Sequence, residues 1–191
     1  MEITYYGHAC FGVKIGKNNL LFDPFITHNP LAADIDIKKI EADHLLISHA
    51  HNDHIGDALE IAKGQDPVLI SNGEVFDWLK EKGIAKGYGM NHGGKIKRDF
   101  GTVRLVNAVH SSSFSDDTYG GNPAGFVIES GEGNFYFSYD SRIINKDTTI
   151  SLHMRGATIQ SFRPTRAPND APATIAFPTR NFFRTSAAQA P

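Results

Sequence analysis

The N-terminal part of the chain alternates between short apolar runs and polar turns. Residues 2–6 and 11–15 are rich in β-branched and aromatic side chains, which predicts two strands. Residues 16–19 (Gly-Lys-Asn-Asn) favour a hairpin turn, because glycine and asparagine tolerate positive φ. Residues 20–22 then form a returning strand. The apolar run 44–48 shows no alternation, so we expect a short strand that is buried on both faces.

The central part of the chain changes from helical to strand periodicity. Apolar spacing over residues 55–63 predicts a helix, and a capping box, Ser71-x-x-Glu74, predicts a second helix that ends at Gly83. Trp78 is expected to pack in the core. A period of two then predicts strands near residues 88–91, 95–99, 102–109, 124–129 and 134–139. This order of elements indicates an α+β fold, either a sheet covered by helices or two sheets packed face to face.

The composition of the chain changes near residue 140. Arginine then replaces lysine as the main basic residue, glutamate is absent, and proline and alanine become frequent towards residue 191. Such a sequence is poor material for a buried sheet. We therefore expect one domain over residues 1–140 and a divergent or out-of-frame tail over residues 141–191 that is poorly ordered.

Charge, hydropathy and cysteine content exclude several classes of function. The formal net charge of −2 predicts no general attraction to nucleic acid or to anionic membranes. No apolar run approaches the roughly 20 residues that span a bilayer, and the first residues do not resemble a secretory leader. Cys10 is the only cysteine, so a reducing compartment is expected. These features predict a soluble cytoplasmic protein with no nucleic-acid or membrane partner. We expect a small-molecule substrate, and homo-oligomerisation stays open.

Residues 49–54 (His-Ala-His-Asn-Asp-His) give the strongest functional signal. They directly follow a predicted buried strand. Side chains alternate along extended backbone, so the imidazoles of His49 and His51 point to the same side. Asp53 and His54 can then turn back and offer ligands to a second, adjacent ion. Because histidine is the commonest metal ligand and no common structural role requires such a cluster, we predict a metal site here.

Two further candidate ligands stand at the ends of predicted strands. His110 ends the strand expected at 102–109, and Asp140 ends the strand expected at 134–139. A histidine or aspartate in such a position can also simply cap a turn. Metal sites are, however, often assembled along one edge of a sheet, so these residues and the cluster together make a pattern.

The spacing His49-x-His51-x-Asp53-His54, followed in order by His110 and Asp140, resembles the signature of the metallo-β-lactamase superfamily. The chain is more closely similar to small metal-dependent hydrolases related to ascorbate-6-phosphate lactonase. The segments that carry this similarity are Tyr6-Gly7-His8-Ala9-Cys10-Phe11, Phe22-Asp23-Pro24-Phe25-Ile26, Ile55-Gly56-Asp57-Ala58, Met90-Asn91, His110-Ser111-Ser112 and Gly120-Gly121-Asn122-Pro123-Ala124-Gly125. The resemblance covers residues 1 to about 140.

The resemblance implies a fold, a ligand set and a chemistry. The fold is an αββα sandwich with the site at one edge, between the sheets. One divalent ion would be held by His49, His51 and His110, a second by Asp53 and His54, and Asp140 would bridge the two. The family's usual metal is zinc, with manganese also used, and the ions convert water into a nucleophilic hydroxide near neutral pH.

Further roles are expected for residues around this ligand set. Asp53 would also orient the hydroxide. Asp23 would be the hydrogen-bond acceptor that fixes a ligating histidine, although a strand-end turn explains an aspartate there equally well. His8 would face the substrate or, alternatively, occupy a turn. The remaining histidines of this part of the chain are expected to be structural or on the surface; they are His28, His44 and His92.

The chain departs from the family pattern at the strand that ends in Asp140 and beyond it. The family strand that ends in the bridging aspartate reads Gly-Asp-Thr, whereas this chain has Tyr139-Asp140-Ser141. The family continues with a second half of the sandwich and a last histidine ligand, for which residues 142–191 are too few. His153 is the only later histidine, and its neighbours do not resemble the family's context. We therefore expect the second half to be truncated or replaced, either by unrelated out-of-frame sequence or by a real, divergent tail.

The predicted function is a metal-dependent hydrolase that cleaves an ester, a lactone or a phosphoester. A phosphodiesterase or nuclease of the same superfamily is the alternative enzyme, although residues 1–140 carry no basic stripe for nucleic acid. A catalytically impaired metal-binding fragment is the alternative from a different class. Such a fragment would take up one ion and turn over no substrate.

Overall fold

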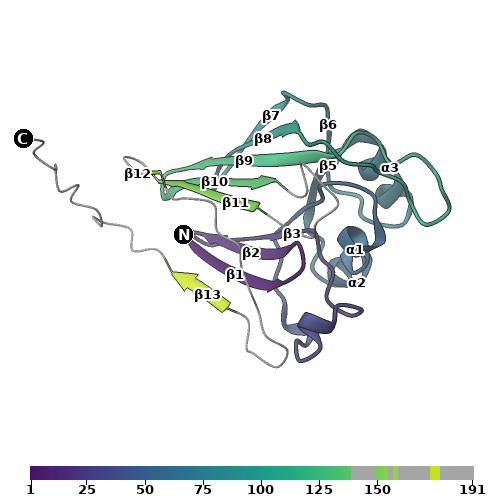
Figure 1. The fold of residues 1–191 in the computed structure, drawn as a ribbon, viewed down its shortest axis with the longest axis horizontal. Helices are drawn as coiled ribbons and strands as arrows, with labels where there is room; N and C mark the ends of the chain where they lie inside the picture. The colour runs from purple at the N-terminus through teal and green to yellow at the C-terminus, as the bar shows by residue number, and fades with distance from the viewer. Residues whose placement is uncertain (139–148, 155–156, 159–172, 177–191) are drawn as a thin grey trace, which may run out of the picture.

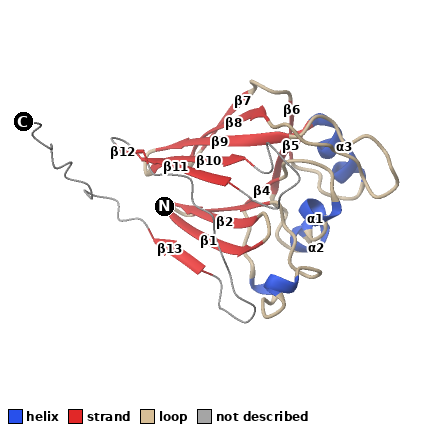
Figure 2. Cartoon of the chain, in the orientation of Figure 1, coloured by secondary structure: helices blue, strands red, loops and turns tan. Residues whose placement is uncertain are grey.

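A computed structural model of the chain describes residues 1–138, 149–154, 157–158 and 173–176, with side chains described for residues 1–138. The described strands form two sheets that lie one above the other (Figure 1). The helices lie beside one end of this pair of sheets, next to the strands β4 to β6 (Figure 2). The two packed sheets confirm the fold class expected from the sequence.

The first sheet has the order β13-β1-β2-β3-β4-β5-β6. Its strands are β1 Glu2–Gly7, β2 Cys10–Ile15, β3 Asn18–Phe22, β4 His44–Leu46, β5 Val68–Asn72, β6 Gly87–Met90 and β13 Ala173–Ala176. The strands from β3 to β6 pair in parallel, and parallel pairs need crossover connections. These crossovers contain the 3-10 turns η1 Pro30–Ala32 and η2 Ile37–Lys39 and the helices α1 Asn52–Ile55, α2 Ala58–Ala62 and α3 Gly73–Glu81.

The second sheet has the order β12-β11-β10-β9-β8-β7 and is antiparallel throughout. Its strands are β7 Lys95–Arg98, β8 Gly101–Asn107, β9 Ala124–Ser130, β10 Gly133–Ser138, β11 Thr149–Met154 and β12 Ala157–Thr158. The strand expected to run to residue 109 thus ends at Asn107. His110 consequently lies in a loop rather than at the end of the strand.

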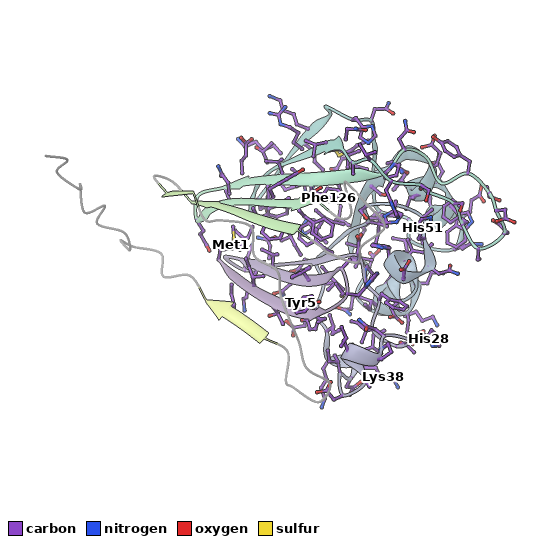
Figure 3. All side chains as sticks on the ribbon, viewed as in Figure 1. Met1, Tyr5, His28, Lys38, His51 and Phe126 are labelled. Carbon is purple, nitrogen blue, oxygen red and sulfur yellow. The ribbon has the colours of Figure 1, made fainter. Side chains whose placement is uncertain are left out.

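Two apolar layers hold these elements together. The layer between the sheets contains a cluster of rings around Phe22, whose centroid lies 5.0 Å from that of Phe137 and 5.2 Å from that of Phe135. Phe126, on β9, points into this layer (Figure 3). The other layer lies between the first sheet and the helices and contains Leu45, Ile47, Leu69, Val75 and Leu79. All three residues of β4 are buried, as its unbroken apolar run predicted.

The prediction of a single helix over residues 55–63 is wrong. The structure has the two short helices α1 and α2, with a break at Asp57. The backbone N–H of Asp57 donates to the Pro24 carbonyl, and its carboxylate accepts the backbone N–H groups of Ile26 and Thr27. Asp57 therefore ties the loop after β3 to the helical crossover, an interaction that local periodicity cannot reveal.

The predicted start of α3 is also corrected by the structure. Asn72, not Ser71, is the N-cap, and its side chain accepts the backbone N–H of Val75. The Ser71 hydroxyl instead donates to the Ile47 carbonyl. Trp78 is half-buried and packs at the margin of the second apolar layer, where it stacks on the buried Phe114 at 4.4 Å between ring centroids.

Three described strands come from the segment after residue 140. β11 and β12 extend the second sheet beyond β10, and β13 pairs with β1 at the edge of the first sheet. Residues 139–148, which include Asp140, lie outside the described residues, as do 155–156, 159–172 and 177–191. The expected division into a domain and a poorly ordered tail stays a prediction.

Candidate metal centre

Three loops meet at the edge of the first sheet formed by the carboxyl ends of β3 and β4. Asp23 follows β3, and residues 49–54 follow β4. Because these strands run parallel, their carboxyl ends lie at the same edge. The loop after β8 joins them, since the backbone N–H of Ala124 at its far end donates to the Ser48 carbonyl. His51 lies at this edge beside α1, at the opposite end of the molecule from Met1 (Figure 3).

His49, His51 and His110 form one set of potential ligands, the triple-histidine group. One nitrogen from each ring lies within 4.8 Å of the others. Nε2 of His49 is 3.0 Å from Nδ1 of His51, and the ring centroid of His110 is 4.8 Å from that of His49. Ligands at about 2.0–2.1 Å from a tetrahedral zinc ion are about 3.3 Å apart. Small adjustments of the rings would therefore suit one ion.

His8, Asp53 and His54 form a second set, the mixed group. Nε2 of His8 lies 3.1 Å from Oδ2 of Asp53, and Nε2 of His54 lies 3.9 Å from Oδ1. The hydrogen bond from His8 holds the pKa of the Asp53 carboxyl well below its usual range, so this group is a carboxylate. The Asp53 side chain is 48% exposed, whereas that of His54 is 1% exposed. The mixed group is therefore open to solvent on one side.

The buried carboxylate of Asp23 lies beneath both groups. It accepts Nδ1–H of His54 at 2.7 Å and both the hydroxyl and the backbone N–H of Ser48, at 2.6 and 2.7 Å. The Ser48 oxygen in turn accepts Nδ1–H of His49 at 2.8 Å. Each histidine thus uses Nδ1 as a donor and keeps Nε2 for a ligand. Burial raises the pKa of Asp23 to about 7, against the hydrogen bonds from Ser48.

Burial keeps the ligating imidazoles in their neutral form. It is the largest cause that lowers the pKa of His49, His51 and His54 below the ordinary value of histidine, and neighbouring histidines add to the shift. A neutral imidazole presents a lone pair, which a divalent cation can accept. Lone pairs that face one another repel unless a proton or a cation lies between them. The donor set therefore fits a divalent metal ion.

Hydrogen bonds clamp the loop that carries His110 against the histidine segment. The Ser112 hydroxyl accepts the backbone N–H of Ala50 at 3.2 Å and donates to the Gly120 carbonyl at 2.9 Å. The Asn72 amide also donates to the Gly120 carbonyl. Only glycine fits at 120, because an added Cβ would lie 2.1 Å from the Ala50 Cβ. This clamp sets where His110 stands relative to the triple-histidine group.

Every predicted site residue whose side chain is described lies in this centre. These residues are His8, Asp23, His49, His51, Asp53, His54 and His110. The side chains of Asp140 and His153 lie outside the described part, so the bridging role of Asp140 stays a prediction. Of the histidines left aside, His28 is exposed, His44 is buried without a hydrogen bond, and His92 donates to the Pro123 carbonyl.

Sequence reasoning missed three residues that shape the centre. Ser48 directly precedes the histidine cluster, and that adjacency is the signal that could have found it. Ser112 stands in the matched segment 110–112 but was given no role. Asn72 carries no local signal, because its partners lie 48 and 50 residues further along the chain.

Comparison with known proteins identifies the lineage. Residues 18–172 match the family model described as the beta-lactamase superfamily domain. The chain belongs to this superfamily. A metal-dependent hydrolase from Flavobacterium johnsoniae is 48% identical, over 80% of this chain and 70% of the relative. Another from Enterococcus faecalis is 36% identical, over 93% of this chain and 81% of the relative.

Solved structures agree with the fold of this chain. A metallo hydrolase from the hyperthermophilic archaeon Ignicoccus hospitalis is 36% identical with a TM-score of 0.60, over 70% of this chain and 57% of that chain. An isothiocyanate hydrolase from Delia radicum gut bacteria, 17% identical with a TM-score of 0.59, shares the fold. The predicted superfamily and fold class are confirmed.

The extent of these matches differs from the extent of the motifs. The family model extends to residue 172, whereas the resemblance found from the motifs covers residues 1 to about 140. The chain spans 57% of the Ignicoccus protein and 64% of a metal-dependent hydrolase from Methylacidiphilum infernorum. Within the described residues, no helix is both long and apolar enough to cross a membrane.

Proposed function

We propose that the chain is a hydrolase that uses zinc, or manganese in its place, to cleave an ester, a lactone or a phosphoester. The observation that carries this proposal is the convergence of two ligand groups, from three separate segments, around the buried carboxylate of Asp23. Nitrogen-rich donor sets with one carboxylate favour zinc over magnesium or calcium. The names of the relatives, all metal-dependent hydrolases, support the reaction class.

In this proposal the triple-histidine group holds one ion, and Asp53 and His54 hold another. Such ions supply Lewis acidity, which lowers the pKa of water and stabilises charge on the attacking and leaving oxygens. Asp23 and Ser48 fix the orientation and tautomer of the histidines before any ligand arrives. Asp140 is proposed as the carboxylate that bridges the two positions.

Asp53 is the residue proposed to manage the attacking water. Its carboxylate is charged at neutral pH, because the pKa is held low, and its side chain is 48% exposed. It can therefore accept a hydrogen bond from a water molecule on the open side and orient that water towards a substrate carbonyl or phosphorus. The open side faces solvent, where His8 also lies and would contact the substrate.

The net charge of the chain disfavours a polyanionic substrate. The net charge of −2 offers no field that would gather a polyanion such as nucleic acid. We propose a lactone, or another small ester or phosphoester, as the substrate, because the matched segments resemble the lactonase-related branch of the superfamily. The free, buried thiol of Cys10 supports a reducing, cytoplasmic setting.

The test is turnover by zinc- and manganese-loaded protein on a panel of lactones, phenyl esters and phosphoesters. His49→Ala removes a ligand and the contact with Ser48, and we expect hydrolysis to fall at least about a hundredfold with loss of bound metal. His28→Ala, an exposed histidine far from the ligand groups in the sequence, is the matched control and should leave both unchanged.

The outcomes separate the proposal from its rivals. Metal uptake without turnover on any substrate of the panel would favour a metal-binding protein over a hydrolase. Preferential cleavage of nucleic acid would favour the phosphodiesterase alternative. Protein that binds no transition metal, with His49→Ala behaving as the wild type, would overturn the proposal.

A further inference from the structure

We infer that His8 is a metal ligand and that it completes, with Asp53 and His54, a three-residue site for the second ion. This inference rests on the proposed function, because it assumes that two ions bind. It departs from the expected roles of His8, which were contact with substrate or a place in a turn. The observation behind it is the convergence of three donor atoms from two segments of the chain that the first sheet brings together.

The donor atoms of the mixed group already lie near the spacing of metal ligands. Nε2 of His8 is 3.1 Å from Oδ2 of Asp53, close to the about 3.3 Å expected between tetrahedral zinc ligands. Nε2 of His54 is 3.9 Å from the other carboxylate oxygen. The His8 and His54 rings are 5.2 Å apart between centroids. The carboxylate thus lies between two imidazoles, and an ion can take one atom from each residue.

The backbone of His8 gives an independent reason to assign it a function. Its φ is +53°, in the left-handed region that a histidine adopts at an energetic disadvantage of about 1 kcal/mol or more. A simple turn between β1 and β2 would be better served by glycine or asparagine at this position. A strained histidine in the tightest part of this hairpin, aimed at a carboxylate, indicates that the imidazole itself is required.

The orientation of His54 shows which of its atoms is left for an ion. Its Nδ1 is held by Asp23 at 2.7 Å, so only Nε2 remains available as a ligand on the side where Asp53 and His8 lie. A catalytic zinc site keeps a position open for water or substrate beside its protein ligands. The open position is present here, since the side chains of His8 and Asp53 are 24% and 48% exposed.

A simpler role for His8 is to donate a hydrogen bond to Asp53 and hold it in place. The two roles make different predictions for His8→Asn. Asparagine tolerates left-handed backbone and can donate a hydrogen bond, but its amide is a poor ligand for zinc. If His8 only positions Asp53, asparagine should largely preserve the second ion. If His8 is a ligand, asparagine should lose it.

The experiment is equilibrium dialysis of the full chain against Zn²⁺, with Co²⁺ absorption spectra as a second readout. We expect the wild type to take up two ions and His8→Asn to take up one, with the affinity of the lost ion reduced at least about tenfold. The Co²⁺ spectrum of the variant should keep only the bands of the triple-histidine group. His28→Asn makes the same substitution at an exposed histidine and should keep both ions.

A rescue variant distinguishes a missing ligand from a damaged fold. His8→Gly accommodates the positive φ and leaves a space that free imidazole can enter. Added imidazole should restore the second ion in His8→Gly but not in His8→Asn, whose side chain fills the space. Restoration in both variants or in neither would contradict a ligand role.

The remaining outcomes identify which idea fails. Two ions bound by His8→Asn with wild-type affinity and spectrum would overturn the role of His8 and leave the proposed hydrolase intact. A wild type that binds a single ion would also overturn it, because there would be no second ion to hold. A wild type that binds none would overturn the proposed function itself.

Discussion

The triple-histidine group and the mixed group lie side by side but differ in how the fold holds their residues in place. The triple-histidine group consists of three imidazoles, and Ser112 fixes the loop that brings His110 by hydrogen bonds to Ala50 and Gly120. The mixed group contains a charged carboxylate that is about half exposed, and one of its rings, His8, comes from a strained turn. The rings of His49 and His54, one from each group, are 4.0 Å apart.

This difference in how the residues are held would suit two ions with separate tasks. A group whose loops are held in place by hydrogen bonds should bind its ion tightly, since little side-chain freedom is lost on binding. A partly open group with a carboxylate should bind more weakly and leave room for water and substrate. Asp23 connects the two groups, because it bonds His54 directly and His49 through Ser48. We therefore expect a substitution of Asp23 to weaken the binding of both ions, and a substitution that touches one group to weaken the binding of one ion.

Asp23→Asn should have the largest effect on metal affinity, because Asp23 supports both groups. Asparagine keeps the size and the left-handed backbone at φ +41° but cannot accept every hydrogen bond that the carboxylate accepts. We expect both ions to bind about ten- to a hundredfold more weakly. Competition with a fluorescent chelator measures this effect. Asp57→Asn, another buried aspartate that touches neither group, is the control, and a loss confined to one ion would contradict the shared role of Asp23.

Ser112→Ala should have a smaller effect, limited to the triple-histidine group. The substitution breaks the hydrogen bonds to Ala50 and Gly120; the Gly120 carbonyl keeps the Asn72 amide, but the backbone N–H of Ala50 loses its acceptor, which destabilises the fold by about 1–3 kcal/mol. The affinity of the tighter ion should fall several-fold, whereas that of the weaker ion should hold. Paired dialysis and denaturant titrations check this. Equal losses at both groups would show that the clamp does not act on His110 in particular.

His44→Leu should change stability while leaving both ions bound. His44 is buried without a hydrogen bond, and burial lowers its pKa to about 4. The unfolded chain binds a proton near pH 6.5, so the folded state loses stability as the pH falls from 6.5 towards 4. Leucine removes this penalty, and the variant should gain about 1–2 kcal/mol relative to the wild type at pH 5.

Denaturant unfolding at pH 7 and pH 5 measures the gain, and metal content provides the control. A variant that loses an ion would place His44 in the centre rather than outside it. A gain of the same size at both pH values would show that the benefit comes from packing rather than from protonation.

Sequence predicted the chemistry of the centre better than its support. The cluster at residues 49–54 is local, so its spacing alone places two imidazoles on one side. His110 was proposed because it was expected at a strand end on the sheet edge, although the structure places it in the loop after β8, and the role of Asp23 came from the family resemblance. Ser112 and Asn72 escaped, since their value lies in contacts with residues far along the chain. The break at Asp57 escaped for the same reason, because its partners belong to the loop after β3.

Anomalous diffraction at the zinc edge, from crystals of the wild-type chain grown with zinc, tests the central claim most directly. We expect two peaks, one among His49, His51 and His110 and one among His8, Asp53 and His54. The first peak should have the higher occupancy at limiting zinc. A single peak, or a second peak beyond bonding distance of the mixed group, would contradict the binding of a second ion by His8, Asp53 and His54.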